Sequence, residues 1–166
     1  MLPGHDRWVD VRSQGSCFVA LSEGVDRIVD RVRRLAETSQ DPAVQIATWS
    51  SLSSYDYYAG RYRAARDHGQ RAIDVVARHD PRDLLRMLLG YNSEAMLYGH
   101  FYGALAECAL GSPERASELA REALAIAEKL DNAYMLTMAL SFTATVIAFA
   151  GDRAGALELA GRALSM

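Results

Sequence analysis

The chain has few of the cysteine and histidine residues that stabilise small proteins through disulfides or bound metal ions. Its 166 residues include two cysteines, Cys17 and Cys108, which lie far apart and belong to no CxxC pair or paired histidine pattern. This usage argues against a disulfide framework and a structural zinc site, and it favours a reducing cytoplasm. We therefore expect a cytoplasmic protein that binds no metal and no cofactor.

Catalytic motifs are absent as well. The four histidines are scattered, and the sequence contains no HExxH, GxSxG or Walker motif. His100 and Cys108 could be paired as base and nucleophile, but eight residues of helix separate them by about 12 Å along the axis. Cys108 is better explained as a small buried thiol. Asp56 and Glu107 stand on mostly apolar helices, where each would cap, pair with an arginine or face a groove. We expect no enzymatic activity.

Charge and hydropathy argue against two further classes of partner. The formal net charge is −3, so no general nucleic-acid-binding surface is indicated. Residues 1–16 have no long apolar core, and we expect a poorly ordered leader there, followed by a single domain over 17–166. Residues 133–150 carry no charge, but serine and threonine interrupt the run and a charged turn follows it. We expect a buried helix in that stretch and no membrane association.

What the sequence does contain is one spacing of small residues that occurs three times. In each set a glycine is followed by small residues at intervals of five, four and three positions. The glycine tolerates positive φ at the end of one helix, and the small side chains let the next helix approach its neighbour closely. Repeating helix-turn-helix units predict an all-α solenoid, and solenoids usually work by offering a surface. The three sets are Gly60, Ala65, Gly69 and Ala72; Gly111, Ala116, Ala120 and Ala123; and Gly151, Ala156, Ala160 and Ala163.

These signals predict about seven helices, mainly in antiparallel pairs near 43–79, 92–130 and 132–166. Residues 81–91 lengthen the connection after the first pair. Their leucines are too apolar for a free linker, so we expect a short additional helix that ends at Gly90.

Several helix ends can also be predicted. Ser22 is the expected N-cap of a first helix over 22–36, and Asn92 or Ser93 is the expected cap of a helix over 94–110. Pro42 suits the opening turn of the second helix. The first helix carries one apolar stripe at helical spacing, formed by Val25, Ile28, Val29, Val32 and Leu35.

The units resemble the tetratricopeptide repeat, a pair of antiparallel helices. Trp49, Leu52 and Ser53 stand where that family places large, medium and small residues in its leading helix, and Gly60 to Tyr62 match its turn. The resemblance implies a right-handed α-solenoid. Later repeats depart from the pattern, with His100 and Leu140 at the tryptophan position and Glu107 and Ile147 at the central tyrosine.

A more specific resemblance covers residues 111–128 and 132–140. These segments are similar to the C-terminal repeats of bacterial multidomain regulators, which join an adenylate-cyclase-like or winged-helix domain to an NTPase and then to such repeats. The resemblance implies a non-enzymatic protein-interaction or scaffold module, the regulatory part of a signalling ATPase or transcription regulator. The alternative is a domain that senses a small-molecule effector in its concave groove.

In the tetratricopeptide fold the leading helices line a concave groove. A groove of rings and hydroxyls suits an amphipathic helix, an extended peptide or a small polar ligand, although several of the rings could instead fill gaps between helices. None of the matching residues could clamp a peptide carboxylate ionically, so chaperone-tail binding is not predicted. The residues that the resemblance places in the groove are Ser50, Ser54, Tyr57, Tyr98, Phe101, Tyr102, Leu105, Met138, Phe142 and Thr145.

The last expected helix, over 154–164, has more apolar surface than one neighbouring helix can cover. Glu158, Arg153 and Arg162 supply only a narrow polar edge. We expect self-association through this helix, as a two-fold homodimer, or its burial by further residues of a longer parent protein.

Overall fold

The computed structural model describes residues 23–89 and 92–166, and this part of the chain contains eight helices and no strand. The all-α fold is confirmed. The short helix expected within 81–91 is α5, which makes the described helices eight instead of about seven. The expected leader and the Ser22 cap lie outside the described residues. The helices are α2 (Glu23–Thr38), α3 (Pro42–Tyr58), α4 (Tyr62–Ala77), α5 (Pro81–Leu88), α6 (Ala95–Ala109), α7 (Pro113–Glu128), α8 (Ala133–Phe149) and α9 (Arg153–Leu164).

Side-chain caps begin several of the helices. Pro42 occupies the first turn of α3 as expected, and the Asp41 carboxylate accepts a hydrogen bond from the Ala43 amide at 2.8 Å. Asn132 caps α8 in the same manner. The cap expected for the fourth helix was wrong, because α6 begins at Ala95 with Glu94 before it and no side-chain cap hydrogen bond.

Three turns share one hydrogen-bonded geometry. Gly60, Gly111 and Gly151 have φ values of 73°, 87° and 98°, in the left-handed region that the repeated spacing predicted. At the first turn the Gly60 amide donates to the Tyr57 carbonyl at 3.0 Å, and the Arg61 amide donates to the Asp56 carbonyl at 2.8 Å. This pair of bonds is a Schellman motif, which satisfies the last carbonyls of α3 and reverses the chain direction. The same pair recurs after α6 and after α8.

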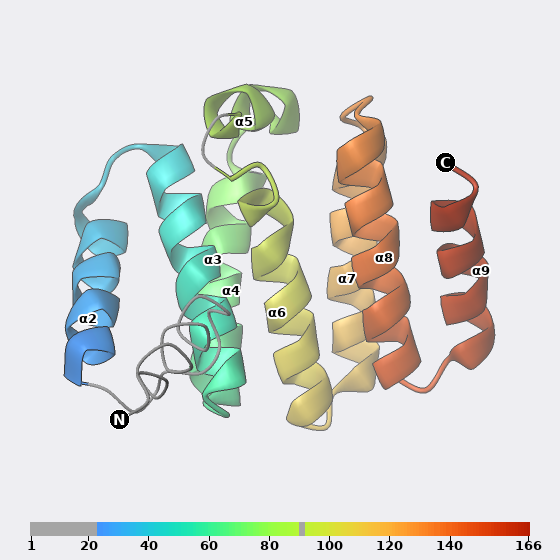
Figure 1. Cartoon of the computed structure of the whole chain (residues 1–166), viewed down its shortest axis with the longest axis horizontal. Coiled ribbons are helices and arrows are strands. Elements are labelled where there is room, and N and C mark those ends of the chain that lie inside the picture. The colour runs from blue at the N-terminus through green and yellow to red at the C-terminus, as the bar shows by residue number, and fades with distance from the viewer. Residues whose placement is uncertain (1–22, 90–91) are drawn as a thin grey trace, which may run out of the picture.

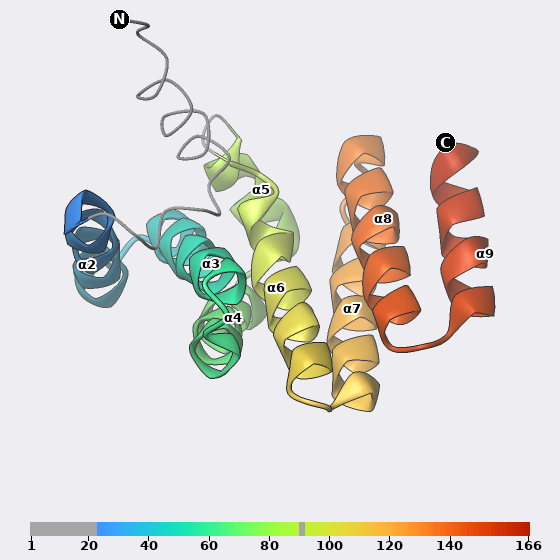
Figure 2. The ribbon, with the colours of Figure 1, turned by 60° about the horizontal axis from the view of Figure 1, so that its bottom comes forward.

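The helices form a row that follows chain order along the long axis of the molecule (Figure 1). α3, α6 and α8 lie side by side in one layer, and α4 and α7 pack behind them in a second (Figures 1 and 2). α2 packs on α3 at one end of the row, α9 packs on α8 at the other, and α5 lies against an end of α3 and α6. The layer of α3, α6 and α8 is therefore a surface built from three helices far apart in sequence.

The two layers approach each other closely where α4 packs on α6. A Cβ atom on Gly69 would lie 2.7 Å from the Gly99 carbonyl oxygen, and one on Gly99 would lie 2.7 Å from the Ala72 Cβ. These backbones touch because neither glycine has a side chain. The small residues of the first two repeated sets that follow the glycine turn are all buried, whereas Ala156 alone is buried in the third set.

Two stretches with strong apolar patterns are buried to different extents. The stripe predicted on the first helix is only partly used, because Ile28 and Leu35 of α2 are 60% and 49% exposed while Val29 and Val32 pack against the core. Residues 133–149 form α8, which is buried on one side only: Leu140 and Val146 are 0% exposed, whereas Tyr134 and Phe149 are 53% and 68% exposed. Within the described residues, no helix has the length and apolar character needed to span a membrane.

Candidate binding face

Seven aromatic rings, six from α3, α6 and α8 and one from the start of α4, form one continuous group of contacts. Phe101 and Phe142 stack with their centroids 4.3 Å apart and their planes at 16°. Tyr102 contacts rings on two helices, including Tyr58 of α3 at 5.6 Å and Tyr98 of its own helix at 5.8 Å. Such offset and edge-on pairs are the arrangements that aromatic rings prefer. We call this group the aromatic face: Tyr57, Tyr58, Tyr62, Tyr98, Phe101, Tyr102 and Phe142.

The rings of the aromatic face are neither core nor free surface. Tyr58 is 46% exposed. Five rings of the face are half-buried: Tyr57, Tyr98, Phe101, Tyr102 and Phe142. Burial raises the pKa of Tyr98, and the nearby charge of Glu94 adds to the effect. The pKa of Tyr57 is also raised by burial. These phenols therefore stay protonated and neutral at physiological pH.

Two of the residues predicted to line the groove are buried instead. Ser50 is 0% exposed, and its hydroxyl donates to the Ala95 carbonyl at 2.7 Å, joining α3 to α6. Leu105 packs in the core with Ala116 and Leu119. The expectation that Ser50 and Leu105 line an open surface was wrong, because the close approach of the helices covers both side chains.

The other predicted residues keep some access to solvent. Ser54 and Met138 are half-buried, and Thr145 is exposed. The hydroxyls do not present free donors: Ser54 donates to the Ser51 carbonyl at 3.0 Å and Thr145 to the Ser141 carbonyl at 2.9 Å. A partner of this face would thus meet ring faces, phenol hydroxyls and hydroxyl lone pairs.

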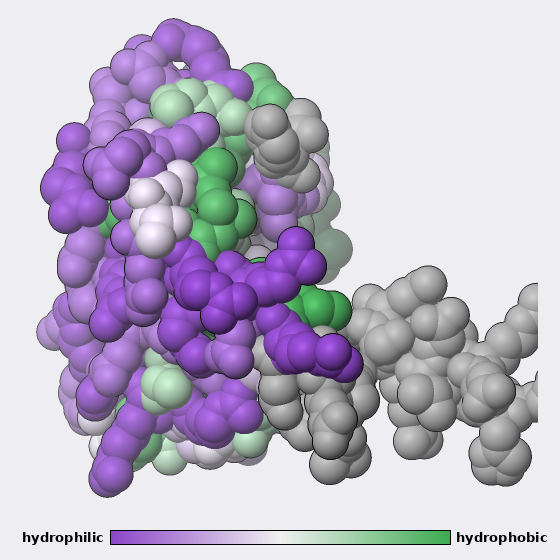
Figure 3. Space-filling view, turned by 90° about the vertical axis from the view of Figure 1, so that its left-hand side faces the viewer, coloured by the Kyte–Doolittle hydropathy of each residue, from purple (hydrophilic) through white to green (hydrophobic). Residues whose placement is uncertain are grey.

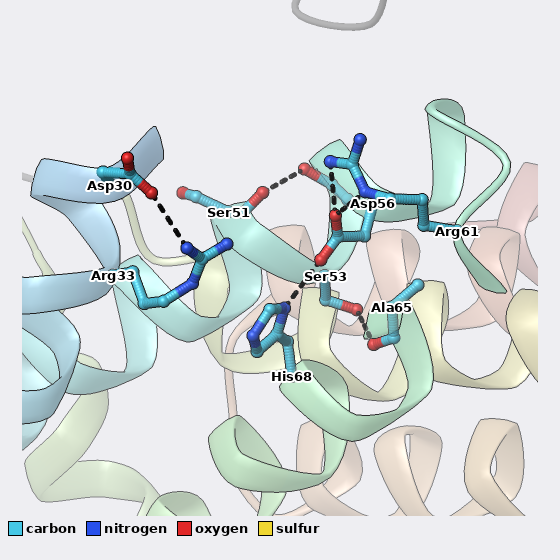
Figure 4. Close-up of polar contacts among 9 residues, drawn as sticks. Asp30, Arg33, Ser51, Ser53, Asp56, Arg61, Ala65 and His68 are labelled. Carbon is cyan, nitrogen blue, oxygen red and sulfur yellow. Dashed lines mark hydrogen bonds and ion pairs between the residues drawn. The ribbon is translucent and has the colours of Figure 1, made fainter. Parts of the chain in front are cut away.

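A buried ionic cluster braces the turn beside the aromatic face. Asp56 is 2% exposed and accepts hydrogen bonds from Arg61 Nε at 2.7 Å and from His68 Nδ1 at 2.8 Å (Figure 4). Burial alone would raise the pKa of Asp56, but the hydrogen bonds from His68 and Arg61 and their charges hold it below its usual value. Trp49 stacks on His68 at 5.4 Å and carries the Arg71 guanidinium 4.6 Å above its ring. Of the roles left open for Asp56, the structure selects pairing with an arginine.

A metal-binding cluster and a reactive thiol are two arrangements that could give this chain chemical reactivity. In the described part of the chain, no three histidine, cysteine, aspartate or glutamate side chains gather as a metal ion would require. Cys108 is half-buried instead of fully buried as expected, and burial raises its pKa, as does the charge of Glu107. The thiolate that nucleophilic chemistry requires is therefore disfavoured.

The described part of the molecule also has clefts outside the aromatic face. One of about 630 Å³ runs along α2 past Ile28 and Leu35, and Figure 3 shows that the surface at this end is mostly hydrophilic with apolar side chains visible between polar ones. Another of about 430 Å³ lies between α2, α3 and α5, one of about 440 Å³ between α8 and α9, and one of about 420 Å³ between α4 and α7. Among the residues predicted for the groove, Thr145 alone lines one of these four clefts.

Reasoning from the sequence missed Tyr58 and Tyr62, which complete the aromatic face. The available signal was the run of tyrosines at 55, 57, 58 and 62, but Tyr58 and Tyr62 do not occupy positions that the repeat resemblance places in the groove. Taken together, the fold and this face define an all-α protein built as a two-layer row of helices with one aromatic surface. Comparisons with known protein families, curated proteins and solved structures found no match to this chain.

Proposed function

We propose that this chain is a non-enzymatic protein-interaction module and that its partner binds the aromatic face. The observation that carries the proposal is the continuity of the rings across α3, α6 and α8 while they keep partial exposure. Tyrosine gives a large contact area with few rotatable bonds, so a cluster of tyrosines is well suited to binding a protein surface.

The chemistry of the face defines the kind of partner. The hydroxyls of Ser54 and Thr145, also predicted for the groove, already donate to their own helices, and Tyr57 and Tyr98 of the face are neutral. A ligand held mainly by charge would find no counter-charge among these side chains. An amphipathic helix or an extended peptide with apolar anchor residues fits best.

The resemblance of residues 111–128 to the repeats of bacterial regulators supports a narrower version of the proposal. In it, this tetratricopeptide-like unit is the regulatory part of a cytoplasmic signalling ATPase or transcription regulator. An in-frame upstream segment with a Walker motif would support this context. An unrelated upstream sequence would count against it.

A displayed library of short random peptides provides a direct test of the aromatic face. Selected peptides should shift the NMR signals of α3, α6 and α8, and Tyr98→Ala combined with Tyr102→Ala should weaken their binding by about tenfold or more, the effect typical of interface hot spots. Phe149→Ala is the matched control, because that ring is 68% exposed and lies outside the face. It should leave binding unchanged.

The control for folding is Tyr58→Ala, since a ring that is 46% exposed can be removed with little loss of core packing. If the double variant unfolds, the tyrosines are core residues, and unchanged peptide binding by Tyr58→Ala would then reject the proposal. Selected peptides that shift only signals remote from the face would reject it as well. A preference for small aromatic compounds over peptides at the same rings would instead favour the effector-sensing alternative.

A further inference from the structure

The cleft between α4 and α7 is a separate feature with the size of a small-molecule site. Its volume is about 420 Å³, within the range of about 300–1,000 Å³ common for ligand pockets. α4 and α7 supply apolar walls, which include Ile73, Val76 and Ile126. His100 of α6 lies between these walls, and Glu122 of α7 and Lys129, the residue that follows α7, are exposed polar residues that also line the cleft.

His100 is an unusual residue to find in such a place. The side chain is 2% exposed, and its Nδ1 atom is buried with no hydrogen bond of normal geometry, although the Met96 carbonyl one helical turn earlier is close enough to interact with the ring. Leaving a buried polar atom unpaired costs about 1–3 kcal/mol, so such atoms are rare unless they serve a purpose. At the corresponding position of the next repeat the chain has Leu140, which is also buried and needs no polar partner.

The ring is uncharged under ordinary conditions. Burial lowers the pKa of His100 to about 4, the charge of Arg115 acts in the same direction, and the Met96 carbonyl opposes the shift. A neutral imidazole has one donor and one acceptor nitrogen, so it can hydrogen-bond a hydroxyl or an N–H group but cannot balance a buried carboxylate.

We propose that this cleft binds a small, mostly apolar organic molecule whose inner end carries an uncharged hydroxyl or N–H group that hydrogen-bonds to His100. Ile73, Val76 and Ile126 would contact the apolar body. Glu122 and Lys129 carry opposite charges, so the cleft shows no preference for an ion of one sign. The site uses α4, α7 and the rear of α6, and it does not depend on the aromatic face.

1-Naphthol and naphthalene form a matched pair of probes, because they share a ring body and differ by one hydroxyl. We expect the wild-type protein to bind 1-naphthol about tenfold more tightly than naphthalene in fluorescence titrations, the factor expected from one hydrogen bond. His100→Leu should retain naphthalene binding and abolish the difference. NMR of the imidazole nitrogens should show a shift of the His100 signals with 1-naphthol and not with naphthalene.

Ala125→Phe tests the location without disturbing the core, because Ala125 is an exposed residue of α7 that lines the cleft. It should weaken both probes. Ala109→Phe, at an exposed position outside the cleft, should weaken neither. Equal affinity of the wild type for both probes, no binding of either at their solubility limits, or unchanged binding by Ala125→Phe would each overturn the proposal. If His100→Leu fails to fold, the NMR shift and Ala125→Phe decide the question.

Discussion

His100 and Asp56 are both buried ionisable side chains, but the surroundings of Asp56 favour its charged form and those of His100 favour its neutral form. Asp56 receives hydrogen bonds from Arg61 and His68, so its charged form is stabilised and its pKa lies below the usual value. His100 is buried with no acidic partner to stabilise its charged form, so burial and the nearby Arg115 charge favour its neutral form. At the scale of single residues, the free energy of unfolding should therefore depend on pH in two separate ranges, one set by His100 and one by Asp56.

The first prediction concerns the higher of these two pH ranges, which His100 sets. The pKa of His100 is about 4 in the folded chain, against 6.5 for an unperturbed histidine. Between these values the unfolded chain binds a proton that the folded chain does not, so stability falls as pH falls. Urea denaturation should show a loss of about 2 kcal/mol between pH 7 and pH 5 from this residue.

His100→Leu should remove this part of the pH dependence, and His79→Gln, at an exposed histidine, should retain it. Asp56 does not affect this comparison. Because its pKa in the folded chain is lowered, its contribution to the free energy of unfolding is lost only at lower pH, as the pH falls through that folded-state pKa. A slope for His100→Leu equal to that of the wild type would show that the imidazole is not held neutral by the fold.

At the scale of the elements, glycine has two different functions in this chain. Gly60, Gly111 and Gly151 end helices with positive φ and have open space around them. Gly69 and Gly99 lie inside helices, where glycine is unfavourable, and they allow α4 and α6 to touch. The helix pair thus depends on the absence of a side chain at the crossing.

The second prediction tests the crossing. Gly69→Ala should destabilise the protein by about 1–3 kcal/mol, because its Cβ would meet the Gly99 carbonyl and backbone atoms cannot move aside cheaply. Gly103→Ala is the matched control in the same interface. Its Cβ would lie 3.9 Å from the Gly69 Cα, an ordinary contact.

Gly103→Ala should therefore stabilise the protein by about 0.5–1 kcal/mol through helix propensity. Thermal and urea denaturation of both variants would give the comparison. If the two substitutions changed stability by the same amount, close approach of the backbones would not be what limits this interface.

The whole molecule leaves apolar side chains uncovered at the α9 end of the row. Leu157 and Leu164 are 74% and 89% exposed, although Leu159 and Ala163 pack against the core. A cleft lined by Ala156 and Leu157 lies between α8 and α9. Exposed leucines two helical turns apart on the same helix favour association in water.

The third prediction is that the chain self-associates through α9, as a two-fold symmetric dimer. Leu157→Gln should shift the sedimentation profile towards monomer at micromolar concentration without lowering the melting temperature, because this side chain is exposed in the monomer. Ile28→Gln on α2 is the control, since that residue is 60% exposed at the other end of the row. A wild-type chain that sediments as a monomer would exclude the dimer.

The local pattern of the sequence determined the elements of this protein. Helices, glycine turns and small-residue stripes follow from short-range sterics, so the turns at Gly60, Gly111 and Gly151 and the short α5 could be predicted. The tertiary structure alone decided how much of each helix face is covered. Ser50 and Leu105 were expected on a surface and are buried, while Ile28 and Leu35, which belong to the apolar stripe of α2, are largely exposed. The unpaired Nδ1 of His100 belongs to the same class, because burial depends on how closely neighbouring helices approach and on what packs beside them, and spacing within one helix does not encode either.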